Sequence, residues 1–177
     1  REMTEMGLDT FIVQDLGFAG LLKAEFPDAV LHASTQTASH SAEQAALLAG
    51  MGFSRMIAAR ELDREALRSL CRSSPLQTEV FIHGALCVSH SGQCLFSSVV
   101  GGRSGNRGEC AQPCRLAYGF DRKNAYPLSL KDLCLAGHIP ELIEMGVASL
   151  KIEGRRKPPS YVYGVVSIYR KLLDERR

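Results

Sequence analysis

Short apolar runs alternate with amphipathic stretches over most of the chain. Five runs rich in Val, Ile, Leu, Phe or Ala are predicted to be strands, at residues 10–14, 29–34, 55–59, 77–82 and 149–152. Apolar positions at helical spacing predict helices over residues 16–25, 39–49, 62–71 and 160–174. The first four strands begin about 20–26 residues apart, a period that is typical of βα units with parallel strands.

These repeated units predict an α/β fold, namely a (β/α)8 barrel of the TIM type that is present only in part. A closed barrel needs about 250 residues, whereas the chain has 177 and shows only five legible units. We therefore expect a single domain over residues 1–177 that holds the later units of a barrel. The strand at residues 10–14 would be an open edge, with about three further units upstream. Ser39 is expected to cap the second helix.

Composition adds little to this picture. Hydrophobic residues make up 45% of the chain and charged residues 23%, and the formal net charge is +2. These values exclude a disordered chain and argue neither for nor against nucleic acid as a partner. No apolar run reaches the ~18–20 residues of a membrane span, and the first residues lack the apolar core of a signal peptide. We therefore expect a cytoplasmic protein with no membrane partner.

The cysteines are the first unusual feature. There are six, and their positions are Cys71, Cys87, Cys94, Cys110, Cys114 and Cys134. The last five have the spacing C-x6-C-x15-C-x3-C-x19-C, which matches neither a zinc ribbon nor a bacterial ferredoxin. In a chain of this length without a secretion signal, metal-binding thiolates fit better than disulfides. Four thiolates suit either a 4Fe–4S cluster or Zn²⁺, and the neighbouring glycines, which let the backbone approach inorganic sulfides, favour the cluster.

Residues 84–122 interrupt the βα rhythm as a Gly/Cys-rich insertion. The insertion follows the strand at residues 77–82 directly and carries four of the cysteines. In parallel α/β folds the functional loops lie at the carboxyl ends of the strands. We therefore expect the insertion on the side of the sheet where chemistry takes place.

Longer motifs surround these cysteines. They are HGALC at residues 83–87, GQC at 92–94, GRSGNRGECAQPCR at 102–115, SLKDLC at 129–134, SLKIEGR at 149–155 and YVYG at 161–164. With them the chain resembles the U32 peptidase, or collagenase-like, family over nearly its whole length, and most of all its long bacterial members that hydroxylate a cytidine of ribosomal RNA. The resemblance implies a (β/α) barrel, a 4Fe–4S cluster and hydroxylation of an RNA base without molecular oxygen. It also implies RNA (rRNA or tRNA) as a partner and a prephenate-like oxygen donor.

Cys87, Cys94 and Cys110 are the predicted cluster ligands. For the fourth, the resemblance favours Cys134 over Cys114, because it implies a ligand in the SLKDLC motif. Cys71 lies within a predicted helix beside Leu67 and Leu70, and we interpret it as a buried core thiol.

Five residues on two strands are candidate catalytic groups. Glu79 and His83 alternate onto one face of their strand, and Lys151, Glu153 and Arg155 stand at the carboxyl end of the last strand, where barrel enzymes place catalysis. The alternative is a set of structural ion pairs and hydrogen bonds.

Polar and basic residues near the strand exits are candidate substrate-binding groups. His32 and Gln36 follow the second strand at even spacing, and Arg103, Arg107 and Arg115 form a basic rim. Clustered arginines suit phosphates or carboxylates. A solvated loop and a solvated basic face are the alternatives.

Signatures of proteolysis are absent from the sequence. The chain has neither a G-x-S-x-G elbow nor an H-E-x-x-H zinc motif, and five clustered cysteines are more than one nucleophile needs. We therefore favour an RNA-modifying hydroxylase and predict no intrinsic peptidase activity. A collagenase-like protease and a zinc-stapled, non-catalytic RNA-binding module stay open as alternatives.

Overall fold

Parallel strands and helices alternate along the first half of the chain, as the apolar pattern predicts. A computed structural model describes residues 2–120, 123–154 and 157–175. The repeated elements are β1 (Thr10–Val13), α2 (Leu16–Glu25), β2 (Val30–Ala33), α3 (Ala42–Gly50), β3 (Phe53–Ile57), α4 (Arg64–Ser73) and β4 (Gln77–Gly84). The final predicted strand and helix are β8 (Ser149–Ile152) and α7 (Pro159–Asp174), which confirms both predictions to within one residue.

Side-chain caps set the first residues of the helices. Asp15 precedes α2 and accepts a hydrogen bond from the Phe18 N–H at 2.8 Å. Helix α3 begins three residues later than predicted, and its cap is Ser41 rather than Ser39. The reason is a 3₁₀ turn, η1 (Thr35–Thr37), which lies between β2 and α3 and delays the start of the helix. Ser39 itself is fully buried, and its hydroxyl bonds the Thr37 hydroxyl at 2.7 Å.

The parallel strands form one open sheet. Strands β1, β2, β3 and β4 pair in parallel in that order, and β8 pairs in parallel with β4. A short strand, β7 (Leu133–Cys134), pairs antiparallel with the end of β4. The mixed α/β fold with parallel strands is therefore confirmed, but the described residues do not close into a barrel. Five parallel strands are too few for eightfold closure, and within the described residues β1 pairs with β2 alone.

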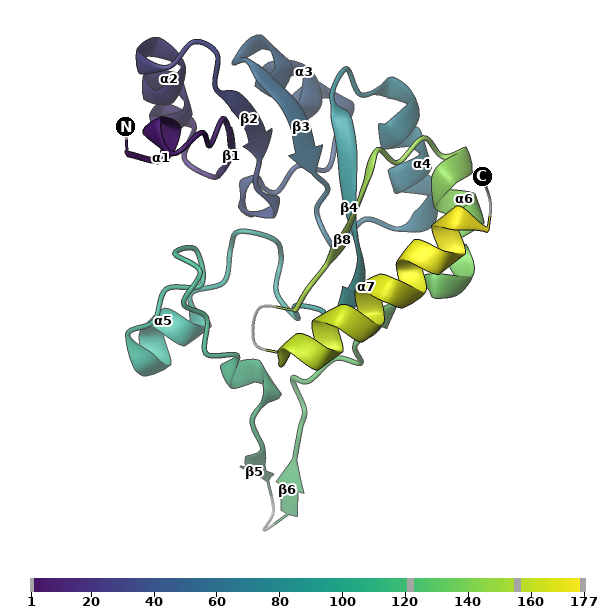
Figure 1. Ribbon diagram of the computed structural model, residues 1–177. Coiled ribbons are helices and arrows are strands. Elements are labelled where there is room, and N and C mark those ends of the chain that lie inside the picture. Colours follow the sequence, from purple (N-terminus) through teal and green to yellow (C-terminus); the bar gives the residue numbers. More distant parts are fainter. Residues whose placement is uncertain (1, 121–122, 155–156, 176–177) are drawn as a thin grey trace.

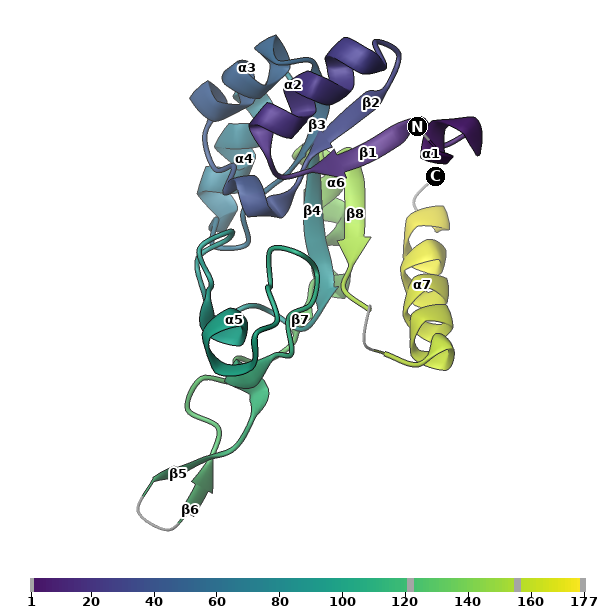
Figure 2. The same ribbon diagram turned by 90° about the vertical axis from the view of Figure 1, so that its left-hand side faces the viewer.

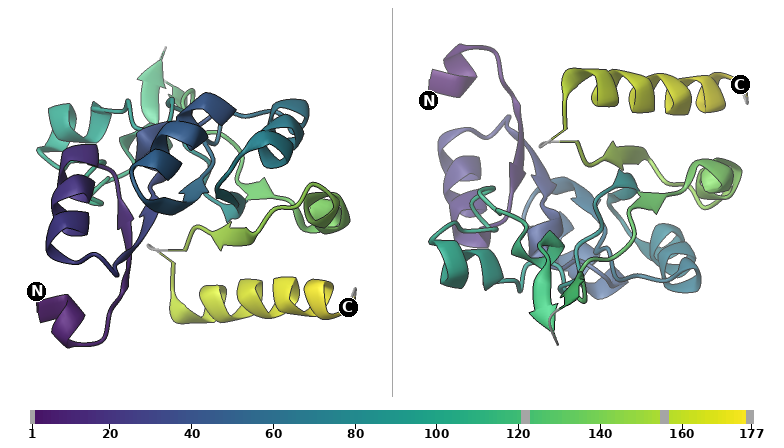
Figure 3. Two further views of the ribbon diagram at one scale, coloured as in Figure 1. Left: turned by 90° about the horizontal axis from the view of Figure 1, so that it is seen from above. Right: turned by 90° about the horizontal axis from the view of Figure 1, so that it is seen from below.

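Helices cover one side of this sheet and leave the other side open. Seen from above, α2, α3, α4 and α6 (Ile139–Glu144) lie along the same side of the curved sheet (Figures 1 and 3). Leu31, Met56 and Ile82, all fully buried, form the core beneath them, and Tyr169 brings α7 into the same core. Alternate residues of the strands point to the opposite side, which we call the concave face.

The insertion is longer than predicted. It contains α5 (Phe96–Gly101), the 3₁₀ turn η2 (Pro113–Arg115) and the strands β5 (Tyr118–Phe120) and β6 (Lys123–Ala125). Because β5 pairs with β6, the insertion continues past residue 122 before the chain returns to the sheet at β7. Figures 1 and 2 show it beyond the carboxyl ends of the parallel strands, with the β5–β6 hairpin projecting from the body. This confirms the side of the sheet on which it was expected.

Three minor elements complete the chain. They are α1 (Glu2–Glu5), at the start, and η3 (Ala136–His138), which leads into α6, together with η1 described above. Among the described residues, none of the helices is both long enough and apolar enough to cross a membrane.

Candidate functional site

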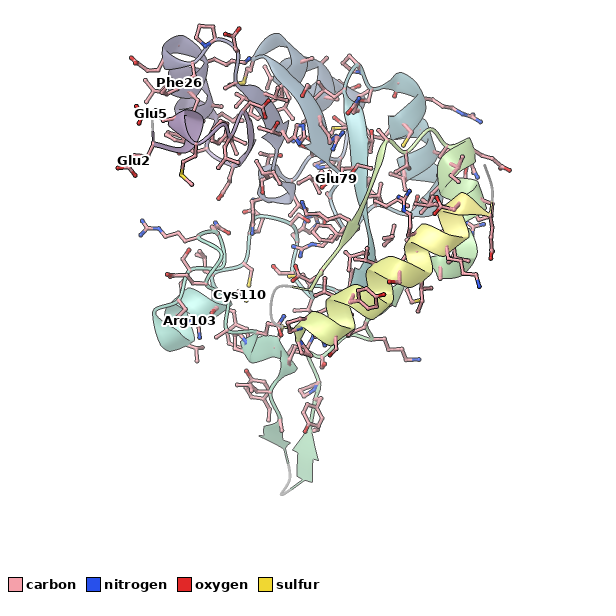
Figure 4. The ribbon with its side chains drawn as sticks, in the orientation of Figure 1. Glu2, Glu5, Phe26, Glu79, Arg103 and Cys110 are labelled. Carbon is pink, nitrogen blue, oxygen red and sulfur yellow. The ribbon has the colours of Figure 1, made fainter. Side chains whose placement is uncertain are left out.

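Four thiols line one cavity between the insertion and the sheet. The cavity measures about 130 Å³, and its lining includes Cys87, Cys94, Cys110 and Cys114. Burial raises the pKa of the Cys114 thiol, and the charges of Cys87 and Cys110 raise it further, as expected for neighbouring thiols. Figure 4 shows Cys110 in the insertion, beyond the strand that carries Glu79.

Cys134, the predicted fourth ligand, lies outside this cavity. It is exposed, it does not line the cysteine cavity, and its Sγ is 3.9 Å from the Tyr169 hydroxyl. The physical reason is the pairing of β7 with β4, which sets Cys134 opposite His83 beside α7. Cys71 packs against the core, where burial raises the pKa of its thiol.

The grouping of potential metal ligands differs from that of a single-ion site. Across the described residues, no three His, Cys, Asp or Glu side chains gather closely enough to hold one metal ion. A tetrahedral zinc ion needs four sulfurs at about 2.3 Å from a single point. A 4Fe–4S cluster distributes four thiolates over four irons, so its ligands stand farther apart.

Two glycines allow the insertion to lie this close to the sheet. Gly84 ends β4 with φ +107°, and a Cβ there would collide with the backbone oxygen of Glu153. Gly92 has φ +76°, and a Cβ there would collide with the backbone oxygen of Gln36. Any other residue would meet both a steric clash and an unfavourable backbone conformation.

A carboxylate on the β3–α4 loop fastens the insertion to the sheet. Glu61 accepts hydrogen bonds from the Ser91 hydroxyl at 2.8 Å and the Ser91 N–H at 3.1 Å, and its carboxylate lies 2.7 Å from His90 Nδ1. Ser91 is fully buried. Burial raises the pKa of Glu61, but the hydrogen bonds from Ser91 and the charge of His90 outweigh it, so that the pKa lies below its usual value.

The arginines of the predicted basic rim do not act as one group. Arg115 donates to the backbone oxygen of Leu86 at 2.9 Å and to that of Leu130, and pairs with Asp132 at 3.1 Å. Its guanidinium therefore holds the insertion together, and Arg115 also lines the cysteine cavity. Arg103 and Arg107 are exposed on the insertion, where Figure 4 shows Arg103 beside α5. Arg155 lies outside the described residues.

A second group of charges lies on the concave face. Glu79 is 7% exposed and pairs with Lys151 at 2.9 Å and with Arg55 at 3.4 Å. Burial raises the pKa of Glu79, but the hydrogen bond and charge of Lys151, helped by Arg55, outweigh it and the pKa falls below its usual value. Burial and the charge of Arg55 lower the pKa of His32 on the neighbouring strand. The structure thus brings together three of the predicted residues, Glu79, Lys151 and His32.

His83 does not join this group. The register between β4 and β8 shifts between Phe81 and His83, and the imidazole contacts α7 instead. Its Nδ1 is 3.2 Å from the Tyr169 hydroxyl, and its ring centroid is 6.1 Å from that of Tyr161. The structure thus places Glu79 beside Lys151 and Arg55, and His83 beside Tyr169.

Glu153 and Gln36 reach the cysteine cavity, as does one residue that the sequence did not single out. Arg60 lies between Ala59 and the fastening residue Glu61, at the carboxyl end of β3, and lines the same cavity. Its Nε is buried and has no hydrogen-bond partner. The available signal was its position, a lone cation directly after an apolar strand and its Ala58–Ala59 extension.

Taken together, the parallel sheet and the cavity beyond its carboxyl ends define an α/β protein with a cysteine-lined site. The profile of the peptidase family U32 matches residues 1–177. The chain belongs to this family.

Relatives with different names align over most of the chain. The chain is 42% identical over 180 residues to the 23S rRNA 5-hydroxycytidine C2501 synthase of Escherichia coli (strain K12), covering 98% of this chain and 27% of that protein. It is 35% identical over 193 residues to tRNA hydroxylation protein P1 of Bacillus subtilis (strain 168), covering 95% and 46%. It is also 35% identical over 165 residues to a collagenase of Porphyromonas gingivalis, covering 81% and 39%. The chain thus spans between about a quarter and a half of the length of these relatives.

A solved structure has a similar fold. The U32 peptidase Mk0906 superposes with a TM-score of 0.53 at 13% identity, over 88% of this chain and 59% of that chain. At this identity the likeness concerns the fold alone.

Proposed function

We propose that this chain carries the cluster-binding part of a U32 protein that hydroxylates a base of rRNA or tRNA without molecular oxygen. The observation that carries the proposal is the single cavity lined by four thiols at the carboxyl edge of the sheet. Relatives named for hydroxylation of rRNA and of tRNA, 42% and 35% identical to this chain, support the choice of RNA as substrate. Because rRNA and tRNA are cytoplasmic in bacteria, a cytoplasmic location stays a prediction for this protein.

The donor set fits a 4Fe–4S cluster better than zinc. Four thiols line the cavity, yet no three ligands converge on one point, which suits four irons more than one ion. We assign Cys87, Cys94, Cys110 and Cys114 as the ligands. A bound cluster would supply one-electron transfer beside the substrate. The zinc-stapled, non-catalytic module is therefore the weaker alternative.

The concave face supplies the groups that would orient a substrate. Glu79, whose pKa lies below its usual value, is ionised at neutral pH and holds Lys151 and Arg55 in place. His32, whose pKa is lowered, is neutral at pH 7, so its imidazole can accept a proton. Glu153, Gln36 and Arg115 are the predicted polar residues that border the cysteine cavity. A prephenate-like oxygen donor would find cationic partners in Arg115 at this cavity and in Lys151 and Arg55 on the concave face.

An anaerobic iron and sulfide assay tests the cofactor. About four irons per chain with the visible absorption of a cluster are expected, and Cys87→Ala, Cys94→Ala, Cys110→Ala and Cys114→Ala should each lose them. Cys134→Ala is the matched control, because it removes a thiol that lies outside the cavity. Full iron in Cys114→Ala together with loss in Cys134→Ala would return the fourth ligand to β7. One equivalent of zinc and no iron would contradict the cluster.

Nucleoside analysis tests the reaction. RNA from cells with and without the intact protein is digested and its nucleosides are weighed by mass spectrometry. A nucleoside heavier by one oxygen should disappear with the protein, and should also disappear when the cluster ligands are replaced. An unchanged set of hydroxylated nucleosides would refute RNA hydroxylation.

The peptidase function of the family name finds less support in the geometry. Cys134 and His83 are neighbours across β7 and β4, but each contacts the Tyr169 hydroxyl instead of the other. A cysteine nucleophile requires a base within hydrogen-bond reach. The absence of intrinsic peptidase activity stays a prediction, and reproducible cleavage of gelatin that is lost in Cys134→Ala would overturn it.

A further inference from the structure

Arg60 stands where three hollows of the molecule meet. It lines the cysteine cavity, a small recess formed with Phe81, His83 and Glu153, and a mostly apolar cavity between α4 and α6. Its Cζ lies 6.0 Å from the centroid of the Phe81 ring, on the strand that also carries Glu79. The guanidinium therefore connects the thiol-lined cavity with the concave face.

This guanidinium forms none of the ion pairs recorded for the described residues. Its backbone N–H bonds the Ser91 hydroxyl at 3.3 Å, but its buried Nε has no partner, and it forms no ion pair within the described chain. Every other arginine discussed above as structural has one, Arg55 with Glu79 and Arg115 with Asp132. A guanidinium stays charged at any physiological pH, and leaving one of its donors buried and unmet is unfavourable. A bound ligand that accepts a hydrogen bond from Arg60 would remove this cost.

The surrounding charges point to an anion as that ligand. Lys151 Nζ lies 5.6 Å from the same Phe81 ring, so two cations flank one aromatic side chain. Of these two, Lys151 is already paired with Glu79. Glu153 is the one acidic residue lining either the cysteine cavity or the recess, and Glu61 is turned away toward Ser91 and His90. A planar fork of donors at the edge of a pocket suits the two oxygens of a carboxylate or phosphate.

We propose that Arg60 anchors a binding site for a small oxyanion, a carboxylate or phosphate group, at the junction between the cysteine cavity and the concave face. The proposal does not depend on hydroxylation or on the cluster, since it rests on the unmet donors of Arg60. It gives the site a positioning residue that would place an anionic reactant directly beside the cysteines.

Calorimetric titration tests the site with two separate probes, malonate for carboxylates and inorganic phosphate for phosphates. Both are titrated at constant ionic strength into the anaerobically purified protein, in iron-loaded and in iron-free form. The wild-type protein should bind at least one probe in both forms, and the preferred probe identifies the oxyanion. Arg60→Gln should weaken that binding by about 10- to 100-fold, the effect of losing charge-assisted hydrogen bonds. Arg72→Gln, which removes an exposed arginine of α4, should leave it unchanged.

Urea unfolding separates a binding role from a structural one. Because the buried Nε of Arg60 has no partner, Arg60→Gln should be at least as stable as the wild type, whereas loss of a structural arginine would lower stability. Should Arg60→Gln fail to fold, Arg60→Lys keeps the charge and loses the fork, and it should bind the probe more weakly than the wild type does. Absence of probe binding by the wild type, or equal binding by Arg60→Gln, would overturn the proposal. So would loss of iron in Arg60→Gln without any probe binding by the wild type, since Arg60 would then serve only as the counter-charge of a cluster.

Discussion

Replacing Ser91 by Ala should loosen the cysteine insertion from the sheet. Ser91 is the fully buried residue that joins the loop between Cys87 and Cys94 to Glu61. The substitution removes one oxygen atom and adds no bulk, so the change it makes is confined to hydrogen bonds. Ser89→Ala is the matched control, because it makes the same chemical change two residues away at a hydroxyl that bonds nothing in the described chain.

The magnitude follows from the bonds that are lost. The hydroxyl of Ser91 donates to Glu61 at 2.8 Å, and a hydrogen bond to a charged group contributes about 1.5–3 kcal/mol. It also accepts the Arg60 N–H at 3.3 Å, a longer bond between neutral groups that adds no more than about 1 kcal/mol. The Ser91 N–H keeps its bond to Glu61. We therefore expect the closed loop to lose about 2–3 kcal/mol, which corresponds to opening about 30- to 150-fold more often.

Hydrogen exchange measures this opening directly. Amide exchange over residues 90–94, followed by mass spectrometry, should quicken by that factor in Ser91→Ala and stay at the wild-type rate in Ser89→Ala. Iron-loaded protein should also lose its iron faster in Ser91→Ala, since the loop carries two of the assigned ligands. Equal exchange in the two variants would show that the Glu61–Ser91 contact does not hold the insertion against the sheet.

Three further substitutions test other parts of the structure. Gly84→Ala should lower the free energy of unfolding in urea by at least about 1–2 kcal/mol, because Gly84 has a positive φ and a Cβ there would clash with the backbone oxygen of Glu153. Gly101→Ala is the control: a Cβ at Gly101 would meet open space, so this variant should be neutral or slightly stabilising. Glu79→Gln should cost about 3 kcal/mol, the lower end of the range for a broken buried pair, because Lys151 keeps 27% of its side chain in solvent. The depressed pKa of Glu79 means that its contribution is complete above the unfolded-state pKa of about 4.3 and disappears as the pH falls through the lower folded-state pKa. The free energies of unfolding of the wild type and of Glu79→Gln, measured against pH, should therefore converge in acid. A difference that stays constant with pH would contradict the ion pair. Cys71→Ala should keep its full iron content, and a loss of iron would place that core thiol in the site.

The order of the elements was readable from the sequence because it depends on local patterns. Period-two and helical spacing placed β1, α2, β8 and α7 within about one residue of their observed ends. The insertion was visible as a break in that rhythm, and its side of the sheet followed from the direction of parallel strands. By contrast, the β5–β6 hairpin and β7 are short and lack a strong apolar pattern, so only their pairing partners define them as strands.

What the sequence determined by itself was which residue types are available, and what the tertiary structure decided was which of them lie together. Cysteine count, spacing and neighbouring motifs predict a cofactor held by thiolates, because residue identity fixes the type of ligand. The gathering of Cys114 rather than Cys134 at the cavity, the hydrogen bonds of Arg115 to backbone oxygens and the separation of His83 from Glu79 all depend on contacts between distant segments. A register shift in β4 and the pairing of β7 redirect these side chains, and neither leaves a periodic trace in the chain. Arg60 was missed for the same reason, since an arginine after a strand is unremarkable until folding buries its Nε without a partner.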